Sequence, residues 1–232
     1  ICVPSGVTEV ERRAVRDSGE KQAAREVFLV DEPVAAAIGI GLDISKPVGN
    51  IIVDIGGGTT EVAVISLNGV VTKKAIRVAG DEMDDAIQHW FRNEHKVEIG
   101  AQTAEQIKIS VGSAMRARSR NILVKGRDLV SGIPKTIDIR TDEIRQALKD
   151  PVKRILGVVI DALEDTPPEL SSDIIDRGIV LAGGGSQLRG LDQVLREKTK
   201  VPVNVAEEPH LAIVKGCGAV IEDLEKHKHV LL

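Results

Sequence analysis

The stretch N-I-I-V-D-I-G-G-G-T-T-E-V-A-V-I-S-L-N-G, residues 50–69, decides the fold. An apolar strand ends in Asp54, three glycines follow, and residues 61–67 have the Val- and Ile-rich, period-2 character of a second strand. Glycine reaches backbone conformations that other residues avoid, so this turn can be tight. It directs several backbone N–H groups toward one point, which suits phosphate oxygens, and an acid beside it suits a hydrated cation. A glycine-rich hairpin without a ligand is the alternative.

The composition excludes several classes of protein. Of the 232 residues, 42% are hydrophobic and 28% are charged, which is ordinary for a globular chain. Aromatic residues make up only 1%, which argues against binding of single-stranded nucleic acid by base stacking. No apolar run approaches the roughly 18 residues that cross a bilayer. Cys2 and Cys217 are isolated in the sequence and fit a reducing cytosol better than a disulfide framework.

The first 46 residues alternate between strand and helix signals. Residues 1–4 and 27–30 have the character of strands, a capping box at 8–11 predicts a helix to about Ala24, and Pro33 suits the first position of another helix. This order favours a parallel α/β layer. The chain opens within a strand and without an initiator Met, so we expect it to be the C-terminal portion of a longer protein.

From residue 47 the pattern changes to consecutive strands. We expect strands at 50–55, 60–67 and 70–78, with Asn68-Gly69 as the two-residue hairpin turn between the last two. Residues 92–140 have the character of an insertion, in which a second capping box at 103–106 predicts a helix to about Ala117. The rest of the chain predicts strands at 121–125, 136–139, 178–182 and 201–205, and helices at 188–198 and from 208 onward.

Three turns that follow strands are candidates for ligand binding, at residues 31–33, 54–60 and 183–188. Two of them also have a purely structural interpretation. Glu32 can simply begin a helix before Pro33, and residues 183–186 are a common kind of strand-to-helix turn. The chain contains neither the Walker pattern G-x-x-x-x-G-K-[ST] nor the dinucleotide pattern G-x-G-x-x-G.

In their order along the chain these turns resemble those of the actin and 70-kDa heat-shock ATPase superfamily. The likeness to the MreB family of bacterial actins is closer and covers essentially the whole chain, with about the first third of such a protein absent. It rests on V-D-E-P-V-A-A-A-I-G (30–39), V-D-I-G-G-G-T-T-E-V-A-V-I-S-L-N-G-V-V (53–71), T-A-E-Q-I-K (103–108), P-P-E-L-S-S-D-I (167–174) and I-V-L-A-G-G-G-S-Q-L-R-G-L (179–191).

The resemblance implies an actin-like, ribonuclease-H-like α/β ATPase fold that binds ATP or ADP with Mg²⁺ between two domains. It implies that Asp54 binds Mg²⁺ through water, and that Glu32 and Thr59 are catalytic residues that place and polarise the attacking water. Taken alone, Glu105 and Lys108 would more simply be an exposed ion pair. The cofactor-binding residues that the resemblance implies are Asp54, Gly56, Gly57, Gly58, Thr59, Thr60, Glu105, Gln106, Lys108, Gly184, Gly185, Ser186, Gln187 and Leu188.

The resemblance also implies a division into domains. Residues 1–46 would be the remnant of the first actin-like domain, whose N-terminal part is missing. Residues 47–206 would be the second domain, with an inserted subdomain at about 92–140. Residues 207–232 would form a C-terminal helix that returns to the first domain.

The expected function is ATP-driven polymerisation into membrane-associated cytoskeletal filaments that control cell shape, with ATPase activity impaired in this fragment. The expected partners are further copies of the chain, the inner, cytoplasmic face of the cell membrane, and proteins of cell shape and wall synthesis, without nucleic acid. A small-molecule kinase of the same superfamily is one alternative, although nothing in the sequence identifies its substrate pocket. A chaperone-type ATPase is another, and it would normally append a substrate-binding domain.

Overall fold

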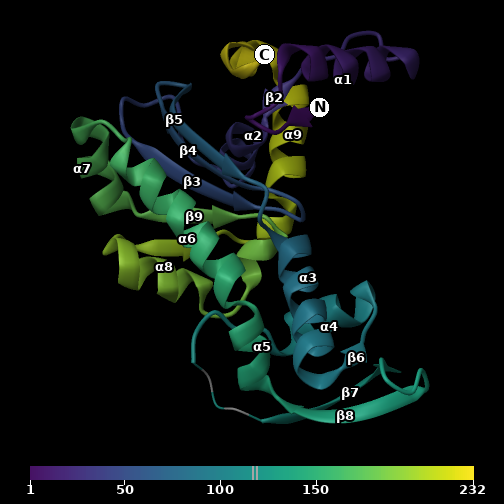
Figure 1. The fold of residues 1–232 in the computed structure, drawn as a ribbon. Helices are drawn as coiled ribbons and strands as arrows, with labels where there is room; N and C mark the ends of the chain where they lie inside the picture. The colour runs from purple at the N-terminus through teal and green to yellow at the C-terminus, as the bar shows by residue number, and fades with distance from the viewer. Residues whose placement is uncertain (117, 119) are drawn as a thin grey trace.

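The computed structural model describes residues 1–116, 118 and 120–232, and its largest element is a five-stranded mixed sheet (Figure 1). β3 pairs antiparallel with β4 and parallel with β9, β4 pairs antiparallel with β5, and β10 runs parallel to β9. The sequence predicted all five strands, with differences of a few residues at their ends. In sheet order they are β10 (Val203–Val205), β9 (Ile179–Ala182), β3 (Asn50–Ile55), β4 (Thr60–Ser66) and β5 (Gly69–Ile76).

Both faces of this sheet are covered by helices, because apolar side chains of β3 and β4 point alternately to either side. Ile51, Val53 and Val62 belong to a core shared with α6 (Lys149–Glu164), α7 (Pro168–Arg177) and α8 (Leu191–Thr199). Ile52 and Ala63 pack on the other face, against α2 (Glu32–Gly39) and α9 (Ala212–Glu222). β3 and β4 are buried along their whole length, which explains their nearly continuous apolar sequence.

The predicted hairpin turn between β4 and β5 is displaced by one residue. Ser66 pairs with Gly69, so the two-residue loop consists of Leu67 and Asn68, both with positive φ (50° and 61°). Positive φ at both positions is the type I′ geometry that matches the twist of paired strands. The Asn-Gly signal therefore marked the correct hairpin, but Gly69 begins β5 instead of completing the loop.

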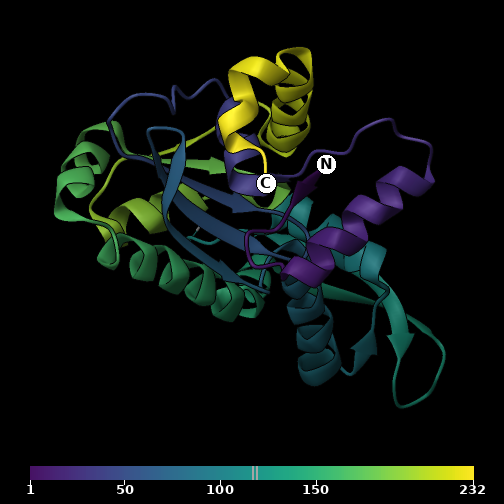
Figure 2. The ribbon, with the colours of Figure 1, turned by 90° about the horizontal axis from the view of Figure 1, so that it is seen from above.

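The N-terminal segment forms a second, two-stranded parallel sheet of β1 (Cys2–Val3) and β2 (Val30–Asp31). Of the strand expected at 27–30, only Val30 is paired, because β1 offers only two residues for pairing. The predicted capping box is present at the start of α1 (Glu9–Lys21), where the Thr8 side chain accepts the Glu11 N–H. α1 has no buried residue and extends away from the five-stranded sheet (Figure 2).

The region expected to be an insertion contains a three-stranded antiparallel sheet, in the order β6 (Val97–Glu98), β7 (Asn121–Asp128) and β8 (Pro134–Arg140). It is reached through α3 (Gly80–Trp90) and the π-helix η1 (Phe91–His95), and it leads into α5 (Thr141–Ala147). The sequence did not predict β6, since two residues carry no periodicity.

The second predicted capping box is wrong. α4 (Ala101–Val111) begins two residues before Thr103, with Gly100 at the N-cap, so Thr103 lies inside the first turn. The helix ends before Gly112 instead of continuing toward residue 117, and residue 117 itself lies outside the described residues. A methyl group on Gly112 would overlap the Lys108 carbonyl oxygen, so the chain can turn here only with glycine.

Short elements complete the chain: the 3₁₀ turns η2 (Gly184–Gln187), η3 (Pro209–Leu211) and η4 (Lys228–Val230), and the helix α10 (Leu224–His227). η2 and η3 delay the start of α8 and α9 by about one turn relative to the prediction. None of the described helices combines the length and apolar character needed to cross a membrane. The domain boundaries at 46/47 and 206/207 stay a proposal.

Candidate functional site

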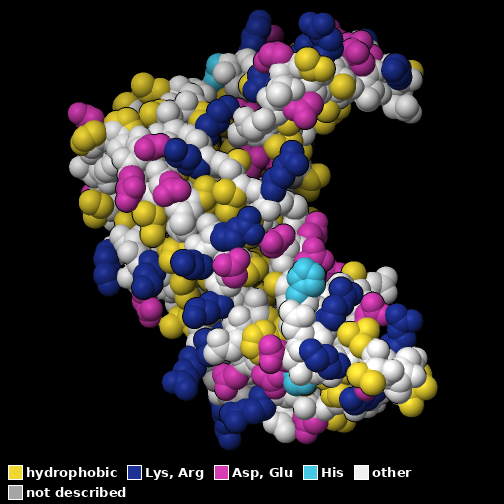
Figure 3. Space-filling view, in the orientation of Figure 1, with side chains coloured by type: hydrophobic (Ala, Val, Ile, Leu, Met, Phe, Trp, Pro, Cys, Tyr) yellow, Lys and Arg dark blue, Asp and Glu magenta, His cyan; other side chains and the backbone are white. Residues whose placement is uncertain are grey.

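A cavity of about 900 Å³ lies where the predicted turns converge. Its volume is within the range of about 300–1,000 Å³ that is typical of ligand pockets. In the space-filling view the molecule is hollowed on one side, between the part that carries α1 and the part that carries the three-stranded sheet (Figure 3). The predicted site residues that line the cavity are Glu32, Asp54, Gly56, Gly57, Gly58, Thr59, Glu105, Lys108, Gly184, Gly185, Gln187 and Leu188.

Three predicted residues do not line this cavity. Thr60 is fully buried and its hydroxyl donates to the Val78 carbonyl oxygen at 2.7 Å. Ser186 is 1% exposed and its hydroxyl donates to the Gly183 carbonyl oxygen at 2.7 Å. Gln106 is exposed on α4. Thr60 and Ser186 therefore brace the turns from inside, and direct contact of these three with a ligand stays a prediction.

The β3–β4 turn is held against the beginning of α3. Gly56 N–H donates to the Thr59 carbonyl at 2.9 Å, which closes the turn. Gly80 N–H donates to the Gly56 carbonyl at 3.1 Å, and Asp81 N–H donates to the Gly57 carbonyl at 2.8 Å. Gly80 and Asp81, which carry no ligand-binding signal in the sequence, also line the cavity.

The turn after β9 closes the opposite side of the cavity. Because β9 is paired in parallel with β3, the ends of both strands reach the same edge of the sheet. Gly183 has a positive φ of 78°, and a methyl group built on it would lie 2.5 Å from Asp54 Oδ1. Only glycine permits both this backbone conformation and this approach. The two glycine turns are therefore brought together by strand pairing.

The carboxylates Glu32, Asp54 and Glu61 lie at this edge, and burial, followed by the charge of a neighbouring carboxylate, raises the pKa of each. Asp54 is 2% exposed, and its Oδ1 atom is without a hydrogen-bond partner. Burial and the charge of Glu61, which is paired with Asp54 across β3 and β4, raise the pKa of Asp54 to about 6. Burial, Glu61 and Asp54 raise the pKa of Glu32 to about 7. At neutral pH Glu32 is thus poised to accept or release a proton.

Glu61 also joins the N-terminal segment to the five-stranded sheet. Its two carboxylate oxygens each accept the Ser5 N–H at 3.1 Å. Lys73 from β5 donates to the Ser5 carbonyl oxygen at 3.1 Å. The loop that follows β1 is therefore fastened to β4 and β5 directly beside the acidic edge, and this contact was not foreseen from the sequence.

Lys108 fastens α4 to α3. Its ammonium group lies 2.7 Å from Asp84 Oδ2 and donates to the Gly80 carbonyl at 3.0 Å. Glu105, one turn away on the same helix, is exposed. The isolated-pair alternative, Glu105 with Lys108, is not the pairing found. Further lining residues that no sequence signal identified are Met83, Ile109, Gly112, Arg189, His210 and Ile213.

The chain has an actin-like α/β fold, in which two glycine turns, several carboxylates and a lysine surround one cavity at the edge of a sheet that helices cover on both faces. Comparison with known proteins agrees with this assignment. The sequence profile described as "MreB/Mbl protein" matches residues 1–229. The chain belongs to the MreB/Mbl family.

Individual relatives support this assignment. The chain is 50% identical over 228 residues to the cell shape-determining protein MreB of Escherichia coli, with 98% of this chain and 66% of that protein covered. It is 46% identical over 227 residues to the cell shape-determining protein Mbl of Bacillus subtilis, with 97% and 68% covered. The chain thus spans about two thirds of the length of these curated relatives.

Solved structures agree with the fold. The crystal structure of MreB5 of Spiroplasma citri bound to ADP has a TM-score of 0.93 and 37% identity, covering 98% of this chain and 69% of that one. MreB5 has also been solved bound to AMPPNP. The double helical filament of MamK has a TM-score of 0.80 at 22% identity, covering 96% and 69%, and shows the fold alone.

Proposed function

We propose that this chain is the larger part of a bacterial actin that binds ATP, hydrolyses it and polymerises into filaments that determine cell shape. The observation that carries the proposal is the cavity of about 900 Å³, which both glycine turns, Glu32, Asp54 and Lys108 line. Support comes from relatives that are cell shape-determining proteins and from MreB5, which has been solved with ADP and with AMPPNP.

The two glycine turns would hold the phosphates from opposite sides. Gly57, Gly58 and Thr59 of the β3–β4 turn would meet the β- and γ-phosphates, since glycines without Cβ atoms let backbone N–H groups approach an anion. Gly184 and Gly185 would meet the nucleotide from the other side. Glu105 and Lys108 on α4 would face the adenosine, which agrees with their place in the wall of the same cavity.

The acidic edge fits a hydrated divalent cation. The buried, unpartnered Oδ1 of Asp54 is an acceptor of the kind that Mg²⁺-bound water requires. When bound, Mg²⁺ would neutralise part of the negative charge of the phosphates. Glu32, with a pKa near 7, would orient the attacking water and take up its proton, while Thr59 would position it. Phosphoryl transfer depends more on positioning and electrostatics than on a protein nucleophile. The side chains and backbone groups named here are therefore of the types that the reaction needs.

Polymerisation would follow from closure of the two domains on the nucleotide. A ligand that contacts both sides of the cavity shifts the equilibrium toward the closed arrangement, to the extent that it binds the closed arrangement more tightly than the open one. Closure changes the surface offered to the next subunit, so hydrolysis can change filament stability. The filaments would lie at the inner face of the cytoplasmic membrane, with proteins of cell shape and wall synthesis as partners.

The test is negative-stain electron microscopy of the full-length protein with Mg²⁺-ATP, without nucleotide, and with the Asp54→Ala variant. We expect filaments with Mg²⁺-ATP only, and a loss of filaments in the variant at nucleotide concentrations that suffice for the unmodified protein. Folded, ATP-bound particles that do not polymerise across salt and lipid conditions would overturn the proposal and favour a kinase or chaperone-type ATPase.

A further inference from the structure

Glu61 is a buried carboxylate of β4 that lies beside the candidate nucleotide cavity without lining it. It is 1% exposed, and the described residues that line the cavity do not include it. It pairs with Asp54 across β3 and β4, as Ala63 pairs with Ile52, so Glu61 and Asp54 project from the face of the sheet that α2 and α9 cover. A buried charge is costly unless it is bonded to a partner, so the contacts of Glu61 indicate its task.

One residue of the N-terminal segment, Ser5, is held by two side chains of the five-stranded sheet. Its N–H donates to both carboxylate oxygens of Glu61 at 3.1 Å, and its carbonyl oxygen accepts from the Lys73 ammonium group at 3.1 Å. Glu61 and Lys73 come from the neighbouring strands β4 and β5. In the part of the chain that the structure describes, Ser5 is the only hydrogen-bond donor to Glu61. We call Ser5, Glu61 and Lys73 the Ser5 clamp.

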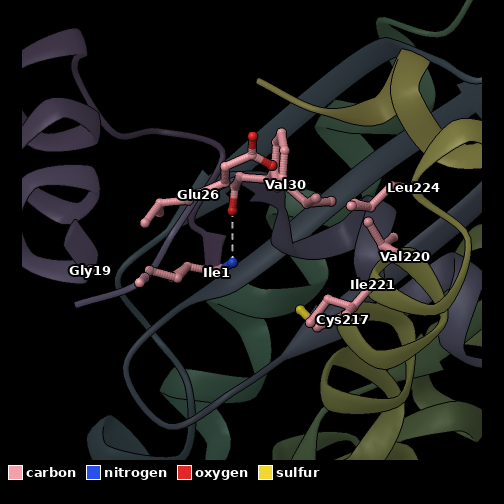
Figure 4. A pocket seen from close by; sticks show the side chains of 11 residues that line it. Ile1, Gly19, Glu26, Val30, Cys217, Val220, Ile221 and Leu224 are labelled. Carbon is pink, nitrogen blue, oxygen red and sulfur yellow. Dashed lines mark hydrogen bonds between the residues drawn. The ribbon is translucent and has the colours of Figure 1, made fainter. Parts of the chain in front are cut away.

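Backbone hydrogen bonds join β1, just before the clamp, to the residues that lead into α2. Val3 is the register partner of Asp31, and the Val30 N–H donates to the Ile1 carbonyl oxygen at 3.0 Å. Beyond the paired residues, the Ile1 nitrogen donates to the Phe28 carbonyl oxygen at 2.8 Å, the hydrogen bond drawn in Figure 4. A restraint on β1 is therefore also a restraint on β2.

The two ends of α2 are fixed by different contacts. At the C-terminal end, a methyl group on Gly39 would overlap the Ala212 carbonyl oxygen, so α2 lies directly on α9. At the N-terminal end, Glu32 follows β2, and a pair of short strands is only marginally stable by itself. The Ser5 clamp supplies hydrogen bonds that fasten this end to β4 and β5, and β4 begins directly after Thr59.

We propose that Glu61 is a positioning residue for ATP hydrolysis, which holds the Glu32 carboxylate in place against the β3–β4 turn by fixing the backbone of Ser5. The inference rests on the proposed function, in which Glu32 orients the attacking water beside phosphates that this turn binds. A misplacement of about 1 Å can lower the rate of a reaction about 100-fold, so the clamp acts on the chemical step. The affinity for ATP stays nearly the same without it, because Glu61 does not reach the cavity.

The experiment measures kcat and KM for Mg²⁺-ATP hydrolysis by the full-length protein and its variants at one protein concentration. Glu61→Ala removes the acceptor of the Ser5 N–H and should lower kcat about 10- to 100-fold, with KM within about threefold of the unmodified value. Glu61→Gln keeps an oxygen that can accept the same N–H and should recover most of kcat. Lys73→Ala removes the other arm of the clamp at an exposed position, so it should fold normally and lose less of kcat than Glu61→Ala.

Thr72→Val is the matched control. Thr72 is buried on β5 beside Lys73, but successive residues of a strand point to opposite faces, and its hydroxyl donates to the Asp165 carbonyl oxygen at 3.3 Å. Valine has nearly the same shape, and the substitution leaves the Ser5 clamp intact. Both kcat and KM should therefore equal those of the unmodified protein.

Three results would overturn the inference on Glu61 alone. The first is hydrolysis by Glu61→Ala at the unmodified rate. The second is a Glu61→Gln variant as slow as Glu61→Ala, because Glu61 would then act through its charge and not through the bond to Ser5. The third is a loss of ATP binding by Glu61→Ala in equilibrium titration, which would show a general structural role. Absence of hydrolysis by the unmodified protein would instead overturn the proposed function, and this inference with it.

Discussion

Gly39 of α2 and Gly216 of α9 face each other where the two helices cross. A methyl group built on Gly39 would lie 2.6 Å from the backbone nitrogen of Gly216, and one built on Gly216 would overlap the Ala35 carbonyl oxygen. The helices therefore approach to backbone contact, which residues with a Cβ do not permit. Since α2 begins with Glu32, this crossing helps to set the position of a carboxylate in the wall of the candidate nucleotide cavity.

Gly216→Ala is expected to destabilise the protein, because its methyl group has no space between α9 and α2. Overpacking of this kind costs about 1–3 kcal/mol in the free energy of unfolding. Gly218→Ala, two residues further along the same helix, is the matched control, since a methyl group there meets nothing within 4 Å. It should stabilise by about 0.5–1 kcal/mol, because alanine favours the helix. Urea unfolding of the full-length variants measures both, and equal effects would contradict the close crossing.

The ion pair between Lys108 and Asp84 is expected to act as a unit. Both side chains are largely buried (15% and 14% exposed), and burial raises the pKa of Asp84 in spite of its partner. Lys108→Ala leaves a carboxylate without compensation and should cost about 1–3 kcal/mol. The double variant with Asp84→Ala should recover part of that loss, as a double-mutant cycle of urea unfolding would show. Strictly additive losses would mean that the pair is not coupled.

Glu32→Gln is expected to retain ATP binding and to lose most ATP hydrolysis in the full-length protein. Glutamine keeps the size of the side chain but cannot accept a proton from the attacking water, and general-base catalysis contributes about 10²–10⁴-fold. Phosphate release and equilibrium nucleotide binding should be measured together. Glu225→Gln, an exposed residue of α10, serves as the control. Unchanged turnover in Glu32→Gln would remove the catalytic role.

Asp54→Ala is expected to weaken binding of ATP in the presence of Mg²⁺ and to have a smaller effect when Mg²⁺ is chelated. The reason is that Asp54 would act on the nucleotide through the hydrated cation and not through a direct contact. Isothermal titration with and without Mg²⁺ separates the two contributions. An unaltered dissociation constant for Mg²⁺-ATP would count against Asp54 as the metal-binding residue.

Asp54 is also expected to make the nucleotide-free protein less stable as pH rises. Its pKa of about 6 in the folded state lies above the ordinary value of 3.8, so the folded state holds the proton more tightly than the unfolded state. The stabilisation is complete below about pH 4 and is lost as pH rises through 6, by about 2–3 kcal/mol. The difference between the unmodified protein and Asp54→Asn, taken across this range by urea unfolding, isolates the effect. A difference that does not vary with pH would show that folding does not raise the pKa of Asp54.

Local patterns in the sequence determined most of the elements and most of the cavity wall. The strand, glycine turn and strand of the quoted stretch form as predicted, because neighbouring residues specify them, and Asp54, the glycines at 56–58 and Thr59 line one cavity. Their binding of phosphate and cation stays a prediction. The capping box at Thr8 is equally local and is present. The same logic failed at Thr103, since Gly100 and the packing of α4 on α3 set the start of that helix instead.

Only the tertiary structure decided which distant residues meet. The parallel pairing of β9 with β3 brings Gly183 to Asp54, and the loop after β1 brings Ser5 to Glu61. No spacing or periodicity in the sequence specifies such contacts, because they depend on how separate elements pack. The raised pKa values of Glu32 and Asp54 belong to the same category, since burial and neighbouring charge exist only once the sheet has assembled.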